Sequence, residues 1–523
     1  GPVAALNLID LLSPALSALA MFWLLRRWTS WAPAAFVGGL FFGFSPFVLV
    51  SLALGHPNFG LLAAVPLIVG CLDELLVRRR RSSVMVGAAL GILVVIQFFV
   101  SVEVLALLVL FAALAAIGMV VRAVVLRRTE AATRALRQAM PGLVAAGVVA
   151  AGLLAYPLWY FFAGPAHLVG RAWPDSPAGT VVNRPADFVN GFVGPGLTNI
   201  MHFFGGYQGP ALPLFCFLGV GMIIVLVTGA AVSYRDRRVQ WFGLLGLVAV
   251  LLSFGIISGT WSPWRLFVHL PVLVNVVPVN ITSIIDTCVA IVLAVIVDRT
   301  HEVAGARMGR NRAMPIAAAV TAVALVPIAV AFWSNIPFAT RVVRAPRWFA
   351  VAAPRRGSHQ VVLPYPAALG GIQSSMAWQA TEGMAFSMVG GGGPGITPSR
   401  AGPERPGFEV LSRASLPLGL APLPTATNLV AIRQALRGWG VTTVVVPDQP
   451  GLPTYDRGRS VGYAVGLFTA AIGDAPALQA QAWVWTLEST LPAPVPMTAA
   501  SFARCTRPVG PGASVAACVL RSA

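Results

Sequence analysis

Long apolar runs without a charged residue recur through the first two thirds of the chain. The runs over residues 84–101, 212–233, 240–258 and 314–333 contain no charged side chain, and about 18 apolar residues in a helix suffice to cross roughly 30 Å of hydrocarbon. No soluble core needs so many runs of this length. The pattern predicts ten transmembrane helices, near residues 5–25, 32–53, 58–77, 84–101, 103–121, 142–163, 212–233, 240–258, 281–297 and 314–333.

The pattern changes after residue 334. Glycine and proline become frequent, and short β-rich stretches occur at residues 361–363, 441–446 and 483–487. Residues 428–440 read as an amphipathic helix that ends at Gly440 and leads directly into the strand VTTVVVP. The sequence therefore predicts a small α/β domain over residues 335–523, after a transmembrane domain over residues 1–334.

A glycine-rich run, GGGGPG at residues 390–395, lies in this second domain. A phosphate-binding loop would need a strand before it and a helix start after it. Pro394 and Pro398 argue against that helix, so a plain loop is the better interpretation.

Charge supports the membrane interpretation. The chain is 57% hydrophobic and only 10% charged, and all 36 basic residues are arginines. Half of these arginines fall in one alternating set of short loops, as expected where positive residues are kept on the cytoplasmic side. The net charge of +18 is therefore no sign of nucleic-acid binding.

The arginine pattern predicts a topology. The loops at residues 26–31, 78–83, 122–141, 234–239 and 298–313 would face the cytoplasm. The loops at 54–57, 164–211 and 259–280 would face outward, as would everything after 334. The predicted fold is an α-helical polytopic membrane domain of about ten transmembrane helices in the inner (plasma) membrane, followed by a small extracytoplasmic α/β domain.

The same topology leaves residue 1 outside. We therefore expect an upstream segment with at least one further span, since no signal peptide precedes Gly1. The alternatives are a miscounted span or a chain whose natural N-terminus lies outside.

The five cysteines fit this map. Cys71, Cys216 and Cys288 lie within predicted spans and read as small apolar residues. Cys505 and Cys518 flank a turn-rich segment of the outer domain, where a disulfide is expected. The six histidines show no metal-ligand spacing.

Acidic residues in the spans are functional candidates, because a charge in hydrocarbon is costly. Asp73 and Glu74 lie one turn from Arg78–Arg81 and are expected to pair with them. Asp10 lies early in the first span, Glu103 opens the fifth near the outer surface, and Asp286 is about two turns into the ninth. A structural role is an alternative for each of them.

The outer loops combine polar and aromatic residues. The first carries His56 and Asn58, and the third carries Arg265 with His269 and two tryptophans. The long loop 164–211 adds Arg184 and Asp187 among others; its further polar and aromatic residues are His167, Arg171, Trp173, Asp175, Asn183, Phe188, Asn190, Phe192, Asn199, His202, Phe203, Phe204 and Tyr207. Such loops suit a ligand with a lipid tail, a phosphate and a sugar, since arginine binds phosphate in a bidentate manner. The alternative is the ordinary enrichment of aromatic residues at membrane interfaces.

At this point a resemblance becomes visible. The N-terminal stretch GPVAALNLIDLLSPALSALAMFWLLRRWTSW is followed by AAFVGGLFFGFSPF, GHPN and a PL-rich third span. Further on come QFFVSVEVL (97–105), NRPADFVNGFVGP (183–195), HLPVLVNVVPVN (269–280), GVTTVVVPD and AWVWTL. In order and layout these segments resemble the YfhO-like and related membrane glycosyltransferases of the GT-C superfamily.

The resemblance implies an enzyme that moves a sugar from a polyprenyl-phosphate donor to a cell-envelope glycan, glycolipid or protein. In that superfamily the catalytic base is typically an Asp or Glu in the first outer loop, which would lie before Gly1. The chain departs from the pattern at Asn280, where an arginine is expected in relatives; Arg265 would replace it in binding phosphate.

The leading hypothesis is thus a glycosyltransferase, or a homologue of one, in an actinobacterial-type envelope. His56 and Asn58 would contact the substrate, Arg184 and Arg265 the phosphate, and Glu103 and Asp187 would act as acid/base groups or hold a divalent metal ion, for which the sequence gives no further indication. A non-enzymatic scaffold or partner of a transferase is one alternative. A lipid or solute transporter is another, although no internal repeat is visible.

Overall fold

The computed structural model describes residues 1–165, 181–190, 214–256, 261–270, 272–333, 342–353, 360–369, 374–391, 404–416, 421–448, 458–506 and 512–522. The chain divides into two compact units. The helical unit comprises Leu6–Leu197 and Gly209–Ala339. The second unit, the α/β unit, consists mainly of Thr340–Ala523.

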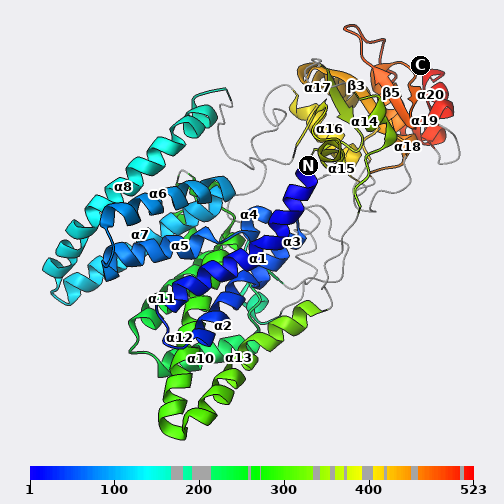
Figure 1. Ribbon diagram of the computed structural model, residues 1–523. Coiled ribbons are helices and arrows are strands. Elements are labelled where there is room, and N and C mark those ends of the chain that lie inside the picture. Colours follow the sequence, from blue (N-terminus) through cyan, green and yellow to red (C-terminus); the bar gives the residue numbers. More distant parts are fainter. Residues whose placement is uncertain are drawn as a thin grey trace. The chain divides into compact units, whose positions relative to one another are not determined.

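The helical unit consists mostly of long helices (Figure 1). Its elements are α1 (Pro2–Arg26), α2 (Ala32–Gly43), α3 (Pro46–Ala53), α4 (Pro57–Gly60), α5 (Ala64–Asp73), the π-helical turn η1 (Glu74–Arg78), α6 (Ser83–Val100), α7 (Val102–Val125), α8 (Thr129–Phe162), η2 (Pro185–Phe188), α10 (Gly219–Val232), α11 (Arg237–Ser253), η3 (Pro263–Leu266), η4 (Leu273–Asn275), η5 (Pro278–Ile281), α12 (Thr282–Met308) and α13 (Arg310–Trp333).

Eight helical stretches within the described residues are long and apolar enough to cross a membrane. They cover residues 2–26, 32–53, 57–78, 83–100, 102–125, 132–162, 278–308 and 311–333. The two other predicted spans coincide with α10 and α11, which have 14 and 17 residues. At 1.5 Å per residue these two helices reach only about 21 and 25 Å, so a count of ten spans stays a prediction.

Helix α12 is the buried axis of the helical unit. Every residue from Thr282 to Asp298 is buried, and α12 packs against α2, α10, α11 and α13 (Figure 1). Gly38 lets the backbone of α2 lie close to α12, because a Cβ at this position would collide with Ala290 and Ala294 of α12. The other helices expose many large apolar side chains, among them Leu11, Val148 and Trp159, as expected of surfaces that face lipid.

The structure corrects two predicted loops. Residues 122–141 were expected as one loop, but α7 continues to Val125 and α8 begins at Thr129. Residues 298–313 likewise continue α12 to Met308, and only Gly309 separates it from α13. Hydropathy marks where a helix leaves the lipid and not where it ends, and Ala, Arg and Glu in these stretches favour helix.

The α/β unit contains a five-stranded mixed sheet in the order β2-β1-β3-β5-β4. Strands β2, β1 and β3 are parallel, whereas β5 runs antiparallel to both β3 and β4. Its elements are α14 (Arg347–Val351), β1 (Val361–Pro364), α15 (Ser374–Thr381), β2 (Ser387–Met388), α16 (Arg405–Ser415), α17 (Ala426–Gly438), β3 (Val441–Pro447), α18 (Val461–Ile472), β4 (Ala477–Gln479), β5 (Ala482–Thr486), α19 (Ala499–Thr506) and α20 (Gly512–Leu520).

The sheet separates two hydrophobic cores. Alternate residues of each strand point to opposite faces, so Val444 and Val446 join the larger core with α16–α20, while Val445 joins the smaller core around Trp348 and Trp378. The predicted helix and strand at residues 428–447 coincide with α17 and β3. Of the glycine-rich run 390–395, only Gly390 and Gly391 lie within the described residues.

A disulfide joins Cys505 of α19 to Cys518 of α20, with their Cα atoms 5.5 Å apart. This is the pairing expected from the sequence. Cys71, Cys216 and Cys288 are free thiols in the helical unit.

Candidate functional site

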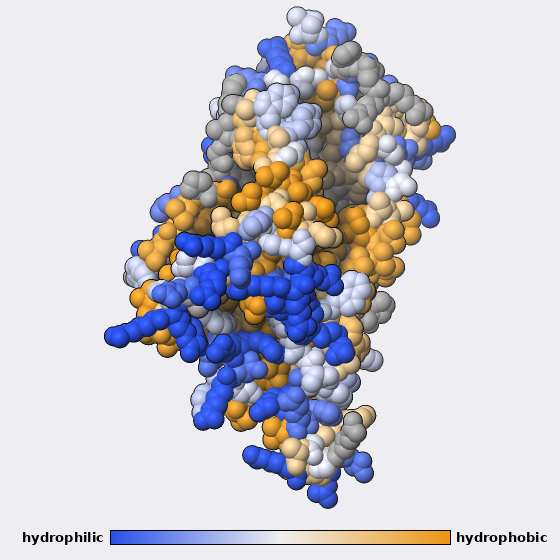
Figure 2. Space-filling view, turned by 60° about the vertical axis from the view of Figure 1, so that its left-hand side comes forward, coloured by the Kyte–Doolittle hydropathy of each residue, from blue (hydrophilic) through white to orange (hydrophobic). Residues whose placement is uncertain are grey.

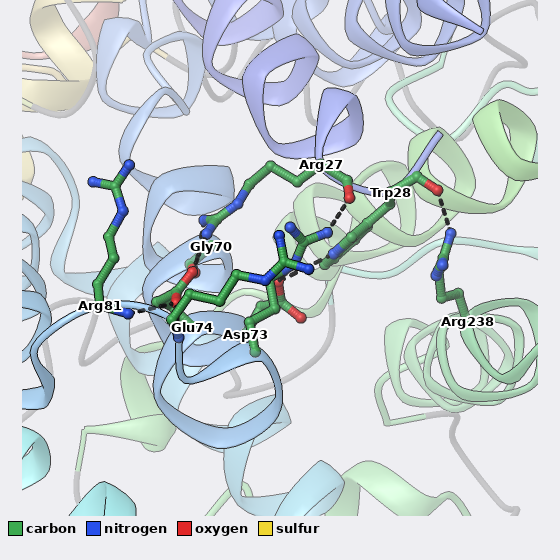
Figure 3. Close-up of polar contacts among 9 residues, drawn as sticks. Arg27, Trp28, Gly70, Asp73, Glu74, Arg81 and Arg238 are labelled. Carbon is green, nitrogen blue, oxygen red and sulfur yellow. Dashed lines mark hydrogen bonds and ion pairs between the residues drawn. The ribbon is translucent and has the colours of Figure 1, made fainter. Parts of the chain in front are cut away.

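The arginine-bearing loops come together at one end of the helical unit, here called the arginine end and comprising residues 26–31, 73–82, 234–240 and 298–302. Trp28 Nε1 donates to Asp73 Oδ2 at 3.2 Å, and Arg238 donates to the Trp28 carbonyl oxygen (Figure 3). The backbone N–H of Trp31 donates to Asp298 Oδ1 at 2.8 Å. Figure 2 shows one face of the molecule, on which a broad hydrophilic area borders apolar surface.

Buried carboxylates hold the arginine end together. Glu74, only 4% exposed, pairs with Arg27 of α1 and accepts hydrogen bonds from the backbone N–H groups of Arg80 and Arg81 at 2.6 and 3.1 Å. Asp73 pairs with Arg78 at 3.0 Å. The expected ion pair is therefore present for Asp73, with Arg78. Glu74 differs from the expectation, because its ion pair is with Arg27 and it contacts Arg80 and Arg81 only through their backbone N–H groups.

A second polar cluster forms where α7 and α12 begin. Glu103, in the first turn of α7, accepts a hydrogen bond from the backbone N–H of Val277 at 2.6 Å and from Asn280 Nδ2 at 3.0 Å. Asn280 is 7% exposed, and Glu103 is half-buried. We call Glu103, Asn183, Asp187, Asn280 and Asp286 the Glu103 site.

Segment 181–190 joins the same place. Asn183 Nδ2 donates to Thr282 Oγ1 at 2.9 Å, and the Val279 N–H donates to the Val181 carbonyl oxygen at 3.1 Å. Asp187 folds back on its own turn, where Oδ2 accepts from the Arg184 N–H at 2.9 Å. Glu103 and Asn183 therefore contact the same stretch, residues 277–282.

Asp286 completes the Glu103 site from within α12. It is 1% exposed and lies beside the Ser45 hydroxyl at the start of α3. Glu103 and Asp286 thus place two carboxyl side chains near the beginning of α12.

The Glu103 site and the arginine end lie at different ends of α12. Sixteen residues separate Thr282, which contacts Asn183, from Asp298, which contacts Ser30 and Trp31. At 1.5 Å per residue this is about 24 Å of helix, most of a hydrocarbon layer.

His56 and Asn58 lie in the short connection before and within α4. The backbone N–H of His56 donates to the Ser51 carbonyl oxygen at 2.8 Å. The centroid of the imidazole ring lies 6.2 Å from that of the Phe59 ring. Burial lowers the pKa of the His56 imidazole, so the neutral form is favoured. The Phe47 ring lies between the rings of Phe59 and Phe215, with its centroid 5.9 Å from each.

The candidate phosphate-binding arginines are both exposed. Arg184 precedes η2, and Arg265 lies within η3. Trp264 beside it is fully buried, whereas Trp261 is 68% exposed. Neither guanidinium has an ion-pair partner among the described residues.

Several sequence candidates lie outside the described residues and gain no structural account. They are His167, Arg171, Trp173, Asp175, Phe192, Asn199, His202, Phe203, Phe204 and Tyr207.

The described residues contain no group of three or more His, Cys, Asp or Glu side chains that could hold a metal ion. The Glu103 carboxylate accepts hydrogen bonds from two nitrogen donors, Val277 N–H and Asn280 Nδ2. The Asp187 carboxylate accepts one from the backbone N–H of Arg184. As they lie, the Glu103 and Asp187 carboxylates do not fit a metal site.

No known protein family, curated protein or solved structure matches the chain. The membrane character follows from the apolar helices.

Sequence reasoning missed the partners of Glu103. The sequence marks Asn280 only as a departure from an expected arginine, and it does not mark Val277 at all. The available signal was an asparagine in an otherwise apolar approach to a span, residues 276–281, because a buried amide needs a hydrogen-bonding partner.

Proposed function

We propose that the protein transfers a sugar from a polyprenyl-phosphate donor to a cell-envelope glycan or glycolipid acceptor at the Glu103 site. One observation carries the proposal: the Glu103 carboxylate is held by Asn280 and Val277 at the end of α12 away from the arginine end. A positioned carboxylate at the membrane boundary is what such a transfer requires of a general base.

The proposed orientation places the Glu103 site and the α/β unit outside the cytoplasm, in an inner (plasma) membrane. Support comes from the arginine end, because positive residues concentrate on the cytoplasmic side. The disulfide Cys505–Cys518 fits an oxidising compartment for the α/β unit.

Different residues would carry out different parts of the proposed reaction. Arg184 and Arg265 would bind the phosphate of the donor through charge-assisted hydrogen bonds. Glu103 would take the proton of the acceptor hydroxyl as its oxygen forms a bond to the anomeric carbon and the bond from that carbon to the donor phosphate oxygen breaks. The lipid phosphate leaves with the electron pair, and His56 and Asn58 would contact the sugar.

The test is an assay of membranes that contain the protein with a radiolabelled polyprenyl-phosphate sugar. We expect Glu103→Gln to lower turnover by at least about 100-fold, the usual contribution of a general base. Arg265→Ala should raise the donor concentration needed for half-maximal rate. Arg312→Ala, an exposed arginine of α13, is the matched control and should leave both unchanged.

Unchanged turnover in both Glu103→Gln and Arg265→Ala would refute the assignment. Donor binding without turnover in the unaltered protein would instead favour the non-enzymatic scaffold.

A second candidate is a transporter, favoured by Asp286. An ionisable residue buried inside a span often belongs to an ion or proton pathway, and Asp286 is 1% exposed within α12. Proteoliposome uptake that is lost in Asp286→Asn but kept in Glu103→Gln would support this candidate over glycosyl transfer.

A further inference from the structure

A cavity opens beside the arginine end, between α5, η1 and the first turns of α6. Its volume is about 590 Å³, and the residues that define its character are Cys71, Glu74, Arg81, Ser82, Met85 and Ala89. None of these residues takes part in the Glu103 site, so the cavity needs its own explanation.

The negative charge at this cavity is already neutralised. Glu74 is paired with Arg27 and accepts two backbone hydrogen bonds from Arg80 and Arg81. Asp73 is likewise paired with Arg78. The charges of Arg27 and Arg78 therefore balance the charges of these two carboxylates.

Positive charge remains in excess around the cavity. Arg79 donates to Gln138, a neutral group, at 2.6 Å. Arg80 and Arg81 are exposed, and neither guanidinium has an acidic partner within 4.0 Å among the described residues. In Figure 3 the Arg81 guanidinium points away from Glu74, although its backbone N–H donates to that carboxylate.

The other wall of the cavity is apolar and continues into the lipid-facing surface. Met85 is 74% exposed, and Ala89, one turn further along α6, is also exposed. Both belong to a helix that is long and apolar enough to span the membrane. The cavity thus has a cationic rim and an apolar wall that runs along the span.

We propose that this cavity binds an anionic phospholipid of the surrounding membrane. The phosphate lies between the Arg81 guanidinium and the Ser82 hydroxyl, and an acyl chain follows Met85 and Ala89 along α6. Charge complementarity selects this occupant, because a zwitterionic headgroup would bring its own cation next to Arg80 and Arg81. The inference is independent of the reaction at the Glu103 site.

The test measures binding of a phosphatidylglycerol with a fluorescent tail to the purified full chain in neutral detergent. Phosphatidylcholine with the same tail and glycerophosphoglycerol without tails are the comparison ligands. Arg81→Gln should weaken phosphatidylglycerol binding about fivefold, the effect of about 1 kcal/mol per arginine near an anionic lipid. Ala89→Phe should weaken it as well, by filling the apolar wall.

Arg237→Gln is the matched control. It removes the same charge at the arginine end, on α11 and away from the lining of the cavity, and should change affinity less than twofold. The proposal is overturned if phosphatidylcholine binds as tightly as phosphatidylglycerol, or if Arg237→Gln weakens binding as much as Arg81→Gln. Equal binding of the tailless headgroup would identify a site for free anions and would also overturn it.

Discussion

At the scale of single residues, the important feature is that the carboxylates of Glu74 and Glu103 have different kinds of partner. Glu74 is neutralised by an arginine and two backbone N–H groups. Glu103 is held by two neutral donors, Val277 and Asn280. Asp298 at the arginine end is also held by neutral donors, from Ser30 and Trp31. What distinguishes Glu103 is that its carboxylate lies at the other end of α12.

The same hydrogen bonds make Glu103 a stabilising residue. Glu103→Ala leaves the Asn280 amide and the Val277 N–H without their acceptor, and each unsatisfied buried donor costs about 1–3 kcal/mol. Glu103→Gln keeps an oxygen that can accept both bonds and should cost less. Thermal unfolding in detergent, followed by tryptophan fluorescence, measures the difference.

Glu130→Ala is the control for this experiment, since Glu130 is exposed in the first turn of α8. It should change stability by less than about 1 kcal/mol. Equal melting temperatures for Glu103→Ala and Glu130→Ala would show that the contacts of Glu103 do not stabilise the fold.

Sequence identified Glu103 but not its setting. An acid at the start of an apolar run is visible without a structure, because its cost in lipid marks it. Its partner Asn280 lies 177 positions away, and no local pattern reports such a pairing. For Glu74, the backbone contacts lie within seven residues, whereas the ion-pair partner Arg27 lies 47 positions away, and no local pattern indicates it.

At the scale of elements, the helices of the first unit approach through small residues. In lipid, burial of apolar surface no longer drives helices together, so close backbone packing gains importance. Gly87 of α6 faces the Gly142 backbone of α8, and Gly91 faces Ala146. Hydropathy located these helices, but it carries no information on which of them pack together.

Gly87→Ala should therefore destabilise the pairing of α6 and α8. Its Cβ would lie well inside van der Waals contact with the Gly142 carbonyl oxygen, and overpacking of this kind costs about 1–3 kcal/mol. Gly147→Ala, in α8 with no atom within 4 Å of the added Cβ, should have no cost and can gain up to about 1 kcal/mol of helix propensity. Melting temperatures that shift in the same direction for both variants would contradict this packing argument.

The disulfide between α19 and α20 is the second element-scale feature. It closes a segment of 13 positions, for which the usual stabilisation is about 2–4 kcal/mol. Cys505→Ala/Cys518→Ala should lower the unfolding temperature of the α/β unit, whereas Cys71→Ala, a free thiol of the helical unit, should not. Alkylation of the unreduced, denatured protein should modify three of the five cysteines, and modification of all five would refute the bond.

At the scale of the whole molecule, the alternation of arginine loops along the sequence corresponds to a real grouping in space. Residues 28, 73, 238 and 298 are far apart in sequence but meet through Trp28–Asp73, Arg238–Trp28 and Trp31–Asp298 contacts. Alternation could be predicted because each span reverses the side on which the chain emerges. The contacts could not, since they depend on the order in which helices pack around α12.

The grouping of the arginine-bearing loops does not by itself identify the compartment that they face, and reporter fusions test this orientation. A fluorescent reporter inserted after Gly309, between α12 and α13, should fold in the cytosol and fluoresce. Alkaline phosphatase fused after Ala523 should be active, because that enzyme needs the disulfides of an oxidising compartment, while the same fusion at Gly309 should be inactive. The reverse pattern would put the Glu103 site on the cytoplasmic side, where the proposed lipid-linked donor would not reach it, and would remove the basis for glycosyl transfer.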